Sequence, residues 1–389
     1  MLSRVRSLAD LTSAVRRSPV TALLGPRQCG KTTLARAFGA SRHLALFDLE
    51  SHVDRQRLQN PEMTLGALKG LVVLDEIQAM PELFGVLRVL VDRPGTTTRF
   101  LVLGSASPTL IRGTSETLAG RIEFVELSGF DAIEAGPESL DTLWLRGGFP
   151  RSFLARNDAD SVAWREGFIR TFLERDIPQL GIRLAAPTLR RFWTMLAHYH
   201  GQTWNGSALS RSLGVSDKTV RAWLDVLTGT YMVRQLLPWF ANVAKRQVKS
   251  PKVYLRDSGL LHSLLNITDH EALSGHPVVG ASWEGFALEQ VLRTLRPLEA
   301  YYWATHNGAE LDLLFMHRGK RFGVEFKLNE APSATRSMHV AMADLKLTHL
   351  WVVYPGRERF EISPGVSAWP LAELATLPRD LALRSRSAK

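Results

Sequence analysis

The strongest chemical signal in the sequence is a phosphate-binding loop near the N-terminus. Residues 25–32 are GPRQCGKT, in which two glycines frame the loop and a lysine and a threonine close it. Glycine allows backbone amides to approach phosphate oxygens closely. Lys31 is expected to contact the β- and γ-phosphates, and Thr32 to ligate magnesium. The loop predicts ATP and Mg²⁺ as cofactors, with these nucleotide-binding residues: Gly25, Pro26, Arg27, Gln28, Cys29, Gly30, Lys31, Thr32 and Thr33.

The residues around the loop predict the secondary structure that this motif requires. Residues 20–24 form a short apolar run typical of a buried parallel strand, and residues 32–38 have helical character. A strand before the loop and a helix after it direct the loop amides and the helix N-terminus at the phosphates. The motif therefore lies in the context of a nucleotide site.

Two carboxylates after another apolar run complete the predicted magnesium site. Residues 71–74 predict a second buried strand, and Asp75 and Glu76 follow it directly. In P-loop ATPases such residues hold Mg²⁺ and act on the attacking water. We expect Asp75 to hold the metal and Glu76 to orient or deprotonate the water.

Two later residues are candidates for sensing and stabilising the γ-phosphate. Ser105 follows the strand predicted at residues 99–103, and Arg121 comes just before a strand-like run at residues 122–127. An arginine can stabilise transition-state charge as an arginine finger, in cis or from a neighbouring subunit. The alternatives are an ordinary turn at Ser105 and a solvated side chain at Arg121.

The single cysteine of the chain, Cys29, lies within the phosphate loop. A nearby helix N-terminus and Lys31 predict a lowered thiol pKa, so that alkylation would block ATP binding and ATP would protect. One cysteine excludes an intrachain disulfide and a cysteine-based zinc site. This composition favours a reducing, cytoplasmic setting.

Taken together, the motifs resemble those of a widespread group of prokaryotic AAA-superfamily ATPases. The segments that carry the resemblance are GPRQCGKTTL, VVLDEIQ, LGSASP, LAGR and GGFP, the last at residues 147–150. The resemblance covers essentially the whole chain and implies an AAA-type P-loop domain followed by a C-terminal domain of unknown function. Cys29 departs from the family, which more often has a small aliphatic residue there.

The middle of the chain predicts a DNA-binding module. Two helices are expected at residues 207–214 and 218–227, joined by a short turn, as in a helix-turn-helix. Residues 232–254 contain two strand-like stretches that suit the wing of a winged helix. The DNA-binding candidates are Lys218, Arg221, Lys245, Arg246 and Lys249, and Lys252 lies in the same basic region. The alternatives are a protein-docking module and a solvated basic edge.

Acidic residues near the C-terminus predict a second site. Glu284 lies on a helix expected at residues 281–295, Asp312 on a strand, and Glu325 with Lys327 on the next strand. A tight turn between the strands sets Asp312 beside Glu325 and Lys327, which share one face because they are two residues apart. Two carboxylates can bind a divalent metal, and a lysine can activate water.

This order of elements resembles the PD-(D/E)XK nuclease superfamily. The resemblance assigns Asp312, Glu325 and Lys327 to its metal and catalytic positions, and Glu284 to its helix carboxylate. The same fold also serves as an inert or DNA-binding module, so the resemblance implies the fold and leaves cleavage open.

The charge and hydropathy of the chain limit the kinds of partner that it could bind. The chain has 48 Lys and Arg against 38 Asp and Glu, a net charge of +10, which favours a polyanion such as DNA and also suits general solubility. No apolar stretch approaches the roughly 20 residues that span a bilayer. For that reason no membrane association is expected. Residues 1–17 predict a first helix in preference to a transit peptide.

The sequence predicts an α/β protein of three domains. These are an AAA-type P-loop domain with a parallel sheet at 1–135, a helical lid and winged helix at 136–255, and a PD-(D/E)XK nuclease-like domain with a basic tail at 256–389. We expect a magnesium-dependent ATPase that couples hydrolysis to DNA binding or remodelling, with a ring or dimer as candidate homo-oligomers. The alternatives are an ATP-gated DNA nuclease in defence or as a toxin, and a nucleotide-switched regulator or scaffold.

Overall fold

A computed structural model describes residues 2, 4–40, 43–105, 117–179, 184–239 and 250–386 of the chain. They divide into two compact units, described in turn. Unit 1 is Met1–Gly129 with Asp225–Met232, and unit 2 is Phe130–Leu224 with Val233–Lys389.

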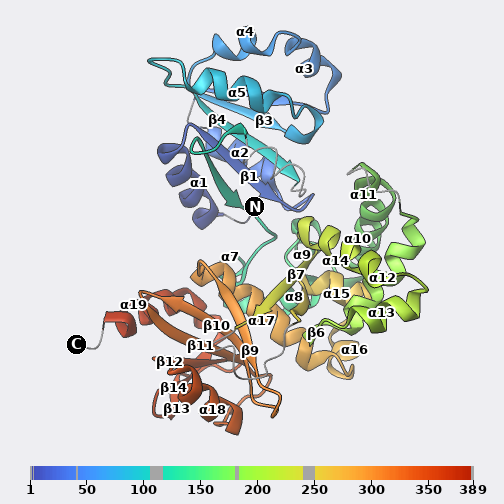
Figure 1. Cartoon of the computed structure of the whole chain (residues 1–389), viewed down its shortest axis with the longest axis vertical. Helices are drawn as coiled ribbons and strands as arrows, with labels where there is room; N and C mark the ends of the chain where they lie inside the picture. The colour runs from blue at the N-terminus through green and yellow to red at the C-terminus, as the bar shows by residue number, and fades with distance from the viewer. Residues whose placement is uncertain are drawn as a thin grey trace. The chain divides into compact units, whose positions relative to one another are not determined.

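Unit 1 is built on a five-stranded parallel sheet in the order β2-β3-β4-β1-β5 (Figure 1). Its strands are β1 (Val20–Gly25), β2 (Leu44–Asp48), β3 (Leu71–Asp75), β4 (Arg99–Ser105) and β5 (Ile122–Glu126). Its helices are α1 (Val5–Arg17), α2 (Lys31–Gly39), α3 (His52–Arg57), α4 (Pro61–Gly66) and α5 (Leu83–Val91), with a short 3₁₀ turn at Ile77–Ala79. The strands predicted at residues 20–24, 71–74 and 99–103 and the first helix are confirmed.

Helices cover both faces of this sheet. Every residue of β1 is buried, as an apolar run between two covered faces requires. On one face α1 and α2 pack through Leu11, Leu34 and Phe38, and on the other α5 packs through Leu83 and Leu87. The carboxyl ends of the strands therefore remain available at one edge, where ligands of open α/β sheets bind.

Unit 2 begins with helices and contains the predicted helix-turn-helix. Its first helices are α7 (Ala132–Ala135), α8 (Leu140–Arg146), α9 (Pro150–Phe153), α10 (Asp158–Thr171), α11 (Ile177–Gln179), α12 (Ala186–His198), α13 (Gly206–Leu213) and α14 (Asp217–Gly229), with a 3₁₀ turn at Pro137–Ser139 and a π-helical turn at Phe172–Asp176. The helix pair predicted at residues 207–214 and 218–227 is confirmed as α13 and α14. The end of α14 belongs to unit 1.

A nine-stranded mixed sheet forms the rest of unit 2, in the order β13-β14-β12-β11-β10-β9-β7-β8-β6. Its strands are β6 (Gln202–Thr203), β7 (Val233–Pro238), β8 (Lys252–Leu255), β9 (Ala300–Ala304), β10 (Glu310–His317), β11 (Lys320–Phe326), β12 (His349–Tyr354), β13 (Phe360–Ser363) and β14 (Val366–Pro370). The helices around it are α15 (Ser258–Leu264), α16 (His270–Ser274), α17 (Val279–Leu295), α18 (Arg336–Leu345) and α19 (Leu377–Arg386), with a 3₁₀ turn at Leu371–Thr376.

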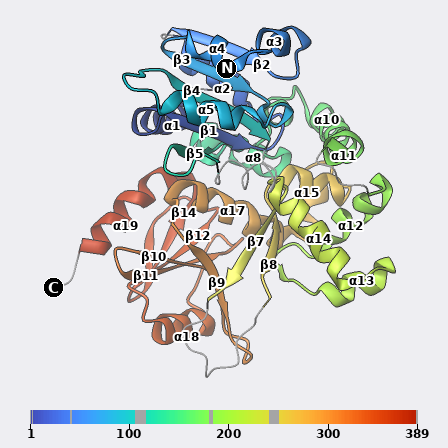
Figure 2. The same cartoon turned by 45° about the horizontal axis from the view of Figure 1, so that its top comes forward.

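The strands of the winged helix belong to this same sheet. β8 pairs antiparallel with both β6 and β7, which gives the wing, and β7 pairs in parallel with β9 at Leu237–Tyr301. Figure 2 shows β7, β8 and β9 side by side. The winged helix and the C-terminal sheet therefore share one backbone hydrogen-bonding network.

The tight turn predicted between the strands of Asp312 and Glu325 is present between β10 and β11. His317 pairs with Lys320, so the loop consists of Arg318 and Gly319, both with positive φ. Two positive φ values are the mark of the tight turn whose twist matches antiparallel strands. This turn fixes the register of β10 against β11.

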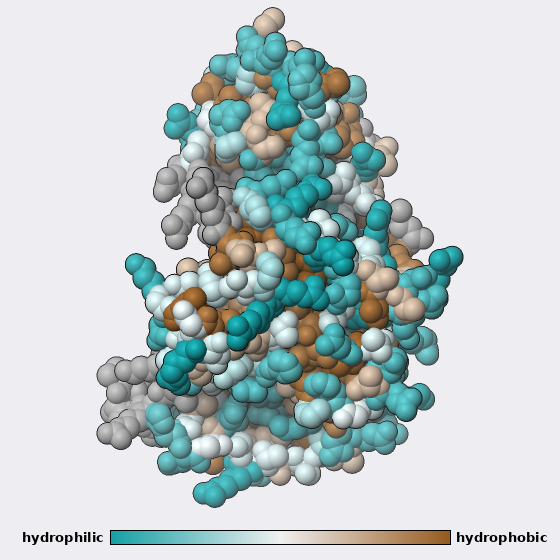
Figure 3. All heavy atoms as spheres, turned by 90° about the vertical axis from the view of Figure 1, so that its right-hand side faces the viewer, coloured by the Kyte–Doolittle hydropathy of each residue, from teal (hydrophilic) through white to brown (hydrophobic). Residues whose placement is uncertain are grey.

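The face drawn in Figure 3 is mainly hydrophilic, with hydrophobic side chains interspersed.

Candidate functional site

The phosphate loop connects the end of β1 to the start of α2. Gly30 has a φ of +99°, in the left-handed region that favours glycine. A Cβ atom on Gly25 would lie 1.9 Å from the carbonyl oxygen of Leu127, so a larger residue does not fit there. The Lys31 ammonium donates hydrogen bonds to the carbonyl oxygens of Gly25 at 3.1 Å and Pro26 at 2.8 Å. The lysine thus lies against the loop that would hold the phosphates.

The magnesium ligands predicted from two distant segments meet in the structure. The Thr32 hydroxyl donates a hydrogen bond to Asp75 Oδ2 at 2.7 Å, and the Glu76 amide donates to Asp75 Oδ1 at 3.0 Å. Burial raises the pKa of Asp75, and the Thr32 hydrogen bond opposes that rise. A hydroxyl beside a carboxylate is the oxygen donor set that Mg²⁺ prefers. Thr32 and Asp75 therefore fit the metal, and Lys31 with the loop amides fits the phosphates of ATP.

Glu76 has an unusual backbone conformation directly after β3. Its φ of 54° and ψ of 50° are left-handed, which costs a non-glycine residue about 1–3 kcal/mol and is typical of functional sites. Its carboxylate accepts a hydrogen bond from the Gln78 side-chain amide. Sequence reasoning missed Gln78, although it lies in the VVLDEIQ motif. The amide holds the carboxylate that is expected to act on water.

The other loop residues lie where the motif places them. Arg27 forms an ion pair with Glu50 at 3.6 Å, Gln28 is exposed with a φ of 61°, and Thr33 is exposed in the first turn of α2. None of these contacts involves a nucleotide, so the nucleotide-binding role of Arg27, Gln28 and Thr33 stays a prediction.

Ser105 lies at the carboxyl end of the parallel strands of unit 1, and Arg121 lies at their amino end. Ser105 is the last residue of β4 and pairs with Gly25, so its backbone adjoins the phosphate loop, while its side chain lies outside the described atoms. Arg121 immediately precedes β5 and its carbonyl oxygen accepts from the Val20 amide, at the far end of β1. Val20 and Gly25 are five residues apart along β1, which corresponds to a distance of about 16 Å.

The distance limits what Arg121 can do. Its guanidinium pairs with Asp92 through two contacts of 2.7 and 2.9 Å and is partly exposed. From the opposite edge of the sheet it does not reach the phosphate loop of its own chain. The sequence analysis allowed Arg121 to act at the site of its own chain or at that of a neighbouring subunit. The geometry disfavours the first role, and the second stays a prediction.

Cys29 differs from the sequence-based expectation. Its side chain is 0% exposed, and its thiol donates to the carbonyl oxygen of Leu127 at 3.4 Å. Burial raises the thiol pKa, and the opposing charges of Lys31 and Arg4 do not reverse the rise. The prediction of a lowered pKa is wrong, because removal from water disfavours the thiolate more than the nearby cations favour it.

The DNA-binding candidates that the structure describes lie on the recognition helix. Lys218 and Arg221 are exposed on α14 and line an open groove of about 710 Å³ together with Trp204 and Asn205 from the segment before α13. Lys245, Arg246 and Lys249 lie outside the described residues. Lys252 is buried, so it does not belong to an exposed basic edge.

The C-terminal carboxylates come together as the hairpin predicts. Asp312 Oδ2 accepts a hydrogen bond from the Phe326 amide at 3.0 Å, which sets β10 beside β11 at this point. Lys327 Nζ pairs with Glu325 Oε2 at 3.0 Å. Burial and the charge of Asp312 raise the pKa of Glu284 to about 7 and also raise that of Glu325. The four predicted residues, Glu284, Asp312, Glu325 and Lys327, thus form one cluster of interacting charges on one face of the sheet.

A further residue in this cluster escaped sequence reasoning. Lys252 Nζ pairs with Glu284 Oε1 at 3.3 Å, Asp312 Oδ1 at 3.6 Å and the Glu310 carboxylate. Nothing in the local sequence distinguishes Lys252 from the exposed lysines predicted for the wing. Within the described ranges, no three His, Cys, Asp or Glu side chains have the arrangement of a metal site.

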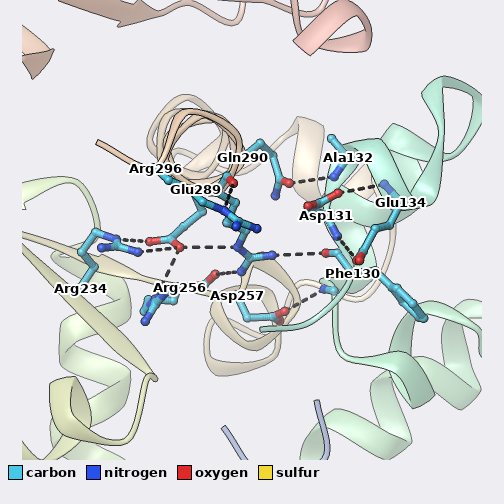
Figure 4. A network of polar contacts seen from close by, with 12 residues as sticks. Phe130, Asp131, Ala132, Glu134, Arg234, Arg256, Asp257, Glu289, Gln290 and Arg296 are labelled. Atoms are coloured by element: carbon cyan, nitrogen blue, oxygen red, sulfur yellow. Dashed lines mark hydrogen bonds and ion pairs between the residues drawn. The ribbon is translucent and has the colours of Figure 1, made fainter. Parts of the chain in front are cut away.

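A second buried ion network lies on the other side of α17, around Glu289 (Figure 4). Glu289 is 1% exposed and pairs with Arg234, Arg256 and Arg293, the last two at 3.4 and 3.8 Å. Burial alone would raise the pKa of Glu289, but the three guanidinium groups lower it to about 2. The side chain of Gln290 accepts from the Ala132 amide at 2.9 Å.

This network is structural. It ties α17 to β7, to the end of β8 and to the first residues of unit 2, since Arg293 also donates to the Phe130 carbonyl at 3.3 Å. Sequence reasoning gave no sign of it, because Arg234 and Arg256 are 55 and 33 positions away from Glu289.

In the part of the chain that the structure describes, no helix is long and apolar enough to cross a membrane.

Three family models match successive parts of the chain. Residues 17–135 match the model of an AAA domain, residues 137–271 that of a domain of unknown function (DUF8612), and residues 279–374 that of another (DUF4143). Uncharacterized proteins of Mycobacterium tuberculosis and Mycobacterium bovis are each 53% identical over 376 residues, covering 97% of this chain and 85% of the relative. Among solved structures, a Walker-type ATPase of Pyrococcus abyssi aligns over 68% of this chain and 96% of that one, at 16% identity and a TM-score of 0.49.

The fold and the phosphate site define a P-loop ATPase of the AAA type. The chain belongs to the family of AAA-domain proteins that contains these two mycobacterial relatives.

Proposed function

We propose that this protein is a magnesium-dependent ATP hydrolase that couples ATP binding and hydrolysis to DNA binding or remodelling. The observation that carries the ATPase part is the hydrogen bond between Thr32 and Asp75. It joins the start of α2, directly after the phosphate loop, to the end of β3, and so brings together the two side chains proposed to hold magnesium.

The residues of the site have separate roles in this proposal. Lys31 and the loop amides bind the β- and γ-phosphates, while Thr32 and Asp75 hold Mg²⁺, which neutralises phosphate charge when bound. Glu76, held by the Gln78 amide, orients the attacking water and accepts its proton. Ser105 contacts the γ-phosphate, and Arg121 serves the site of a neighbouring subunit in a homo-oligomer.

The DNA part is supported by the recognition helix. Lys218 and Arg221 are exposed on α14, which follows α13 as a recognition helix follows its partner in a helix-turn-helix. The groove beside them opens to solvent, and its mostly polar lining includes Lys218, Arg221, Trp204 and one acidic residue, Asp217. The net charge of +10 favours a polyanionic partner.

The test is the ATPase rate of the full chain with and without single-stranded, duplex and branched DNA. We expect Glu76→Gln to retain ATP binding and to lose hydrolysis by about 100-fold or more, because a general base contributes that much. Lys31→Ala is expected to lose nucleotide binding itself. Glu82→Gln is the matched control, since Glu82 is an exposed glutamate after the same strand.

Each outcome separates the candidate functions. Parental turnover by Glu76→Gln would refute the catalytic assignment. Stimulation by DNA supports the proposed coupling, and metal-dependent nicking would instead favour the ATP-gated nuclease. Hydrolysis that no DNA changes would favour a nucleotide-switched regulator or scaffold.

A further inference from the structure

Four acidic side chains of unit 2 gather around one lysine from a different part of the sheet. Glu284 comes from α17, Glu310 and Asp312 from β10, and Glu325 from β11. Lys252 comes from β8, on the winged-helix side, and its ammonium contacts the first three of these carboxylates. The residues that resemble a phosphodiesterase metal site therefore already have a cation among them.

This cation belongs to the interior of the protein. Lys252 is 5% exposed, and its Nζ lies 5.7 Å from the centre of the Tyr302 ring on β9. A buried carboxylate needs a compensating charge, because isolated charges are strongly destabilised away from water. Lys252 supplies that charge to Glu284 and Asp312, while Lys327 supplies it to Glu325.

Several of the carboxylate oxygens already accept hydrogen bonds or contact a lysine. Glu284 Oε1 accepts from the Tyr254 hydroxyl at 2.6 Å and also contacts Lys252, while Asp312 uses Oδ2 for the Phe326 amide and Oδ1 for Lys252. The Lys252 ammonium thus contacts the carboxylates of Glu284, Asp312 and Glu310 at the same time.

A divalent metal and this ammonium exclude each other. Mg²⁺ needs oxygen ligands at about 2.0–2.1 Å and Ca²⁺ at about 2.3–2.6 Å, both closer than the ammonium lies to Glu284 and Asp312. A metal bound to the same oxygens would lie within a few ångströms of the ammonium, where two like charges repel each other strongly in a buried site. With Lys252 in place, the residues present do not fit a divalent metal.

We propose that Lys252 is the resident cation of this cluster and takes the place of the metal that the carboxylates would otherwise bind. The C-terminal part of unit 2 then holds the residue types of a metal-dependent phosphodiesterase in an inert form, with an ammonium group among the carboxylates. The proposal is independent of the ATPase site, whose residues all lie in unit 1.

The test compares Mn²⁺ binding by four full-length proteins without nucleotide, by isothermal titration and by electron paramagnetic resonance of free Mn²⁺. The parental chain and Asp312→Asn should bind Mn²⁺ equally, through the phosphate-loop residues alone. Lys252→Met, which keeps the side-chain length without the charge, should gain one further site. Lys252→Met combined with Asp312→Asn should lose that gain, which assigns the new site to the cluster.

Loss of the lysine leaves carboxylates without compensation, so Lys252→Met could fail to fold. In that case Lys252→Met with Glu310→Gln restores the charge balance and still offers Glu284 and Asp312 to the metal. Circular dichroism checks folding in each variant. Mn²⁺ binding by the parental chain that Asp312→Asn abolishes would overturn the proposal. A folded Lys252→Met variant, with or without Glu310→Gln, that gains no site would overturn it equally.

Discussion

Single side chains in the nucleotide site depend on burial as much as on residue type. Thr32 and Asp75 are adjacent because β3 ends where α2 begins, and Glu76 is held by Gln78 in a left-handed backbone conformation. At Cys29 the structure differs from the sequence-based expectation. The local sequence suggests a reactive thiol, but the surrounding core makes the thiol inert. A thiol with no exposed surface is both protonated and shielded from reagents.

Native Cys29 should therefore react slowly with iodoacetamide. A fully buried thiol reacts only when the structure around it opens, so we expect the native rate at pH 8 to be at most about a tenth of that in urea. Mass spectrometry of the intact chain measures the rate, and Cys29→Ala gives the background because the chain has one cysteine. Equal rates in the native and unfolded chains would show that the thiol is accessible.

At the scale of elements, α17 organises unit 2 through two buried ion clusters. Glu284 faces the cluster of β8, β10 and β11, and Glu289 faces that of β7 and the start of the unit. A helix with a charged residue every few positions looks half-exposed in sequence, yet most of α17 is buried. Pairing with distant lysines and arginines makes this burial tolerable.

Replacing Glu289 should be costly. Glu289→Gln leaves three arginines without their shared partner, and breaking a buried ion pair costs about 3–5 kcal/mol. We expect a loss of that size in urea unfolding at pH 7. Glu271→Gln is the control, because Glu271 is exposed.

The pH dependence of this loss has a definite sign. The pKa of Glu289 falls from an ordinary value of 4.5 to about 2 on folding, a difference of about 3 kcal/mol in stability. That contribution is complete above pH 4.5 and disappears as the pH falls towards 2. The stability gap between the parental chain and Glu289→Gln should therefore narrow between pH 5 and pH 3, and a constant gap would contradict the assignment.

At the scale of the whole molecule, the proposed coupling requires that DNA binding by unit 2 alter hydrolysis in unit 1. The double variant Lys218→Ala with Arg221→Ala should hydrolyse ATP at the parental rate without DNA, because both residues lie outside the phosphate site. DNA affinity should fall, the salt dependence should become shallower by about one unit per lost phosphate contact, and any stimulation by DNA should diminish.

The control for this variant removes equal charge elsewhere. Arg379 and Arg386 are exposed on α19, at the other end of unit 2 from α14 (Figures 1 and 2), and their joint replacement by alanine lowers the net charge by the same amount. Fluorescence anisotropy at several salt concentrations compares the two double variants. Equal losses of affinity would mean that overall charge, and not the recognition helix, binds DNA.

The sequence by itself determined the features that depend on local order. The phosphate loop, its flanking strand and helix, the helix pair α13–α14 and the turn at Arg318 and Gly319 each lie within a short segment, so spacing and residue type suffice to predict them. The carboxylates at Asp312 and Glu325 were also predictable, because a two-residue hairpin fixes which strand positions are opposite.

Tertiary structure decided the features that join distant segments. Lys252 looked like part of an exposed basic wing, and only the pairing of β7 with β9 brings β8 near enough to β10 for its ammonium to meet Asp312. The Glu289 network, the burial of Cys29 and the distance of Arg121 from its own phosphate loop have the same origin. Charge compensation and burial are properties of three-dimensional neighbourhoods. Lys252 is 60 positions from Asp312 and Cys29 is 98 from Leu127, so the local sequence carries no signal of these contacts.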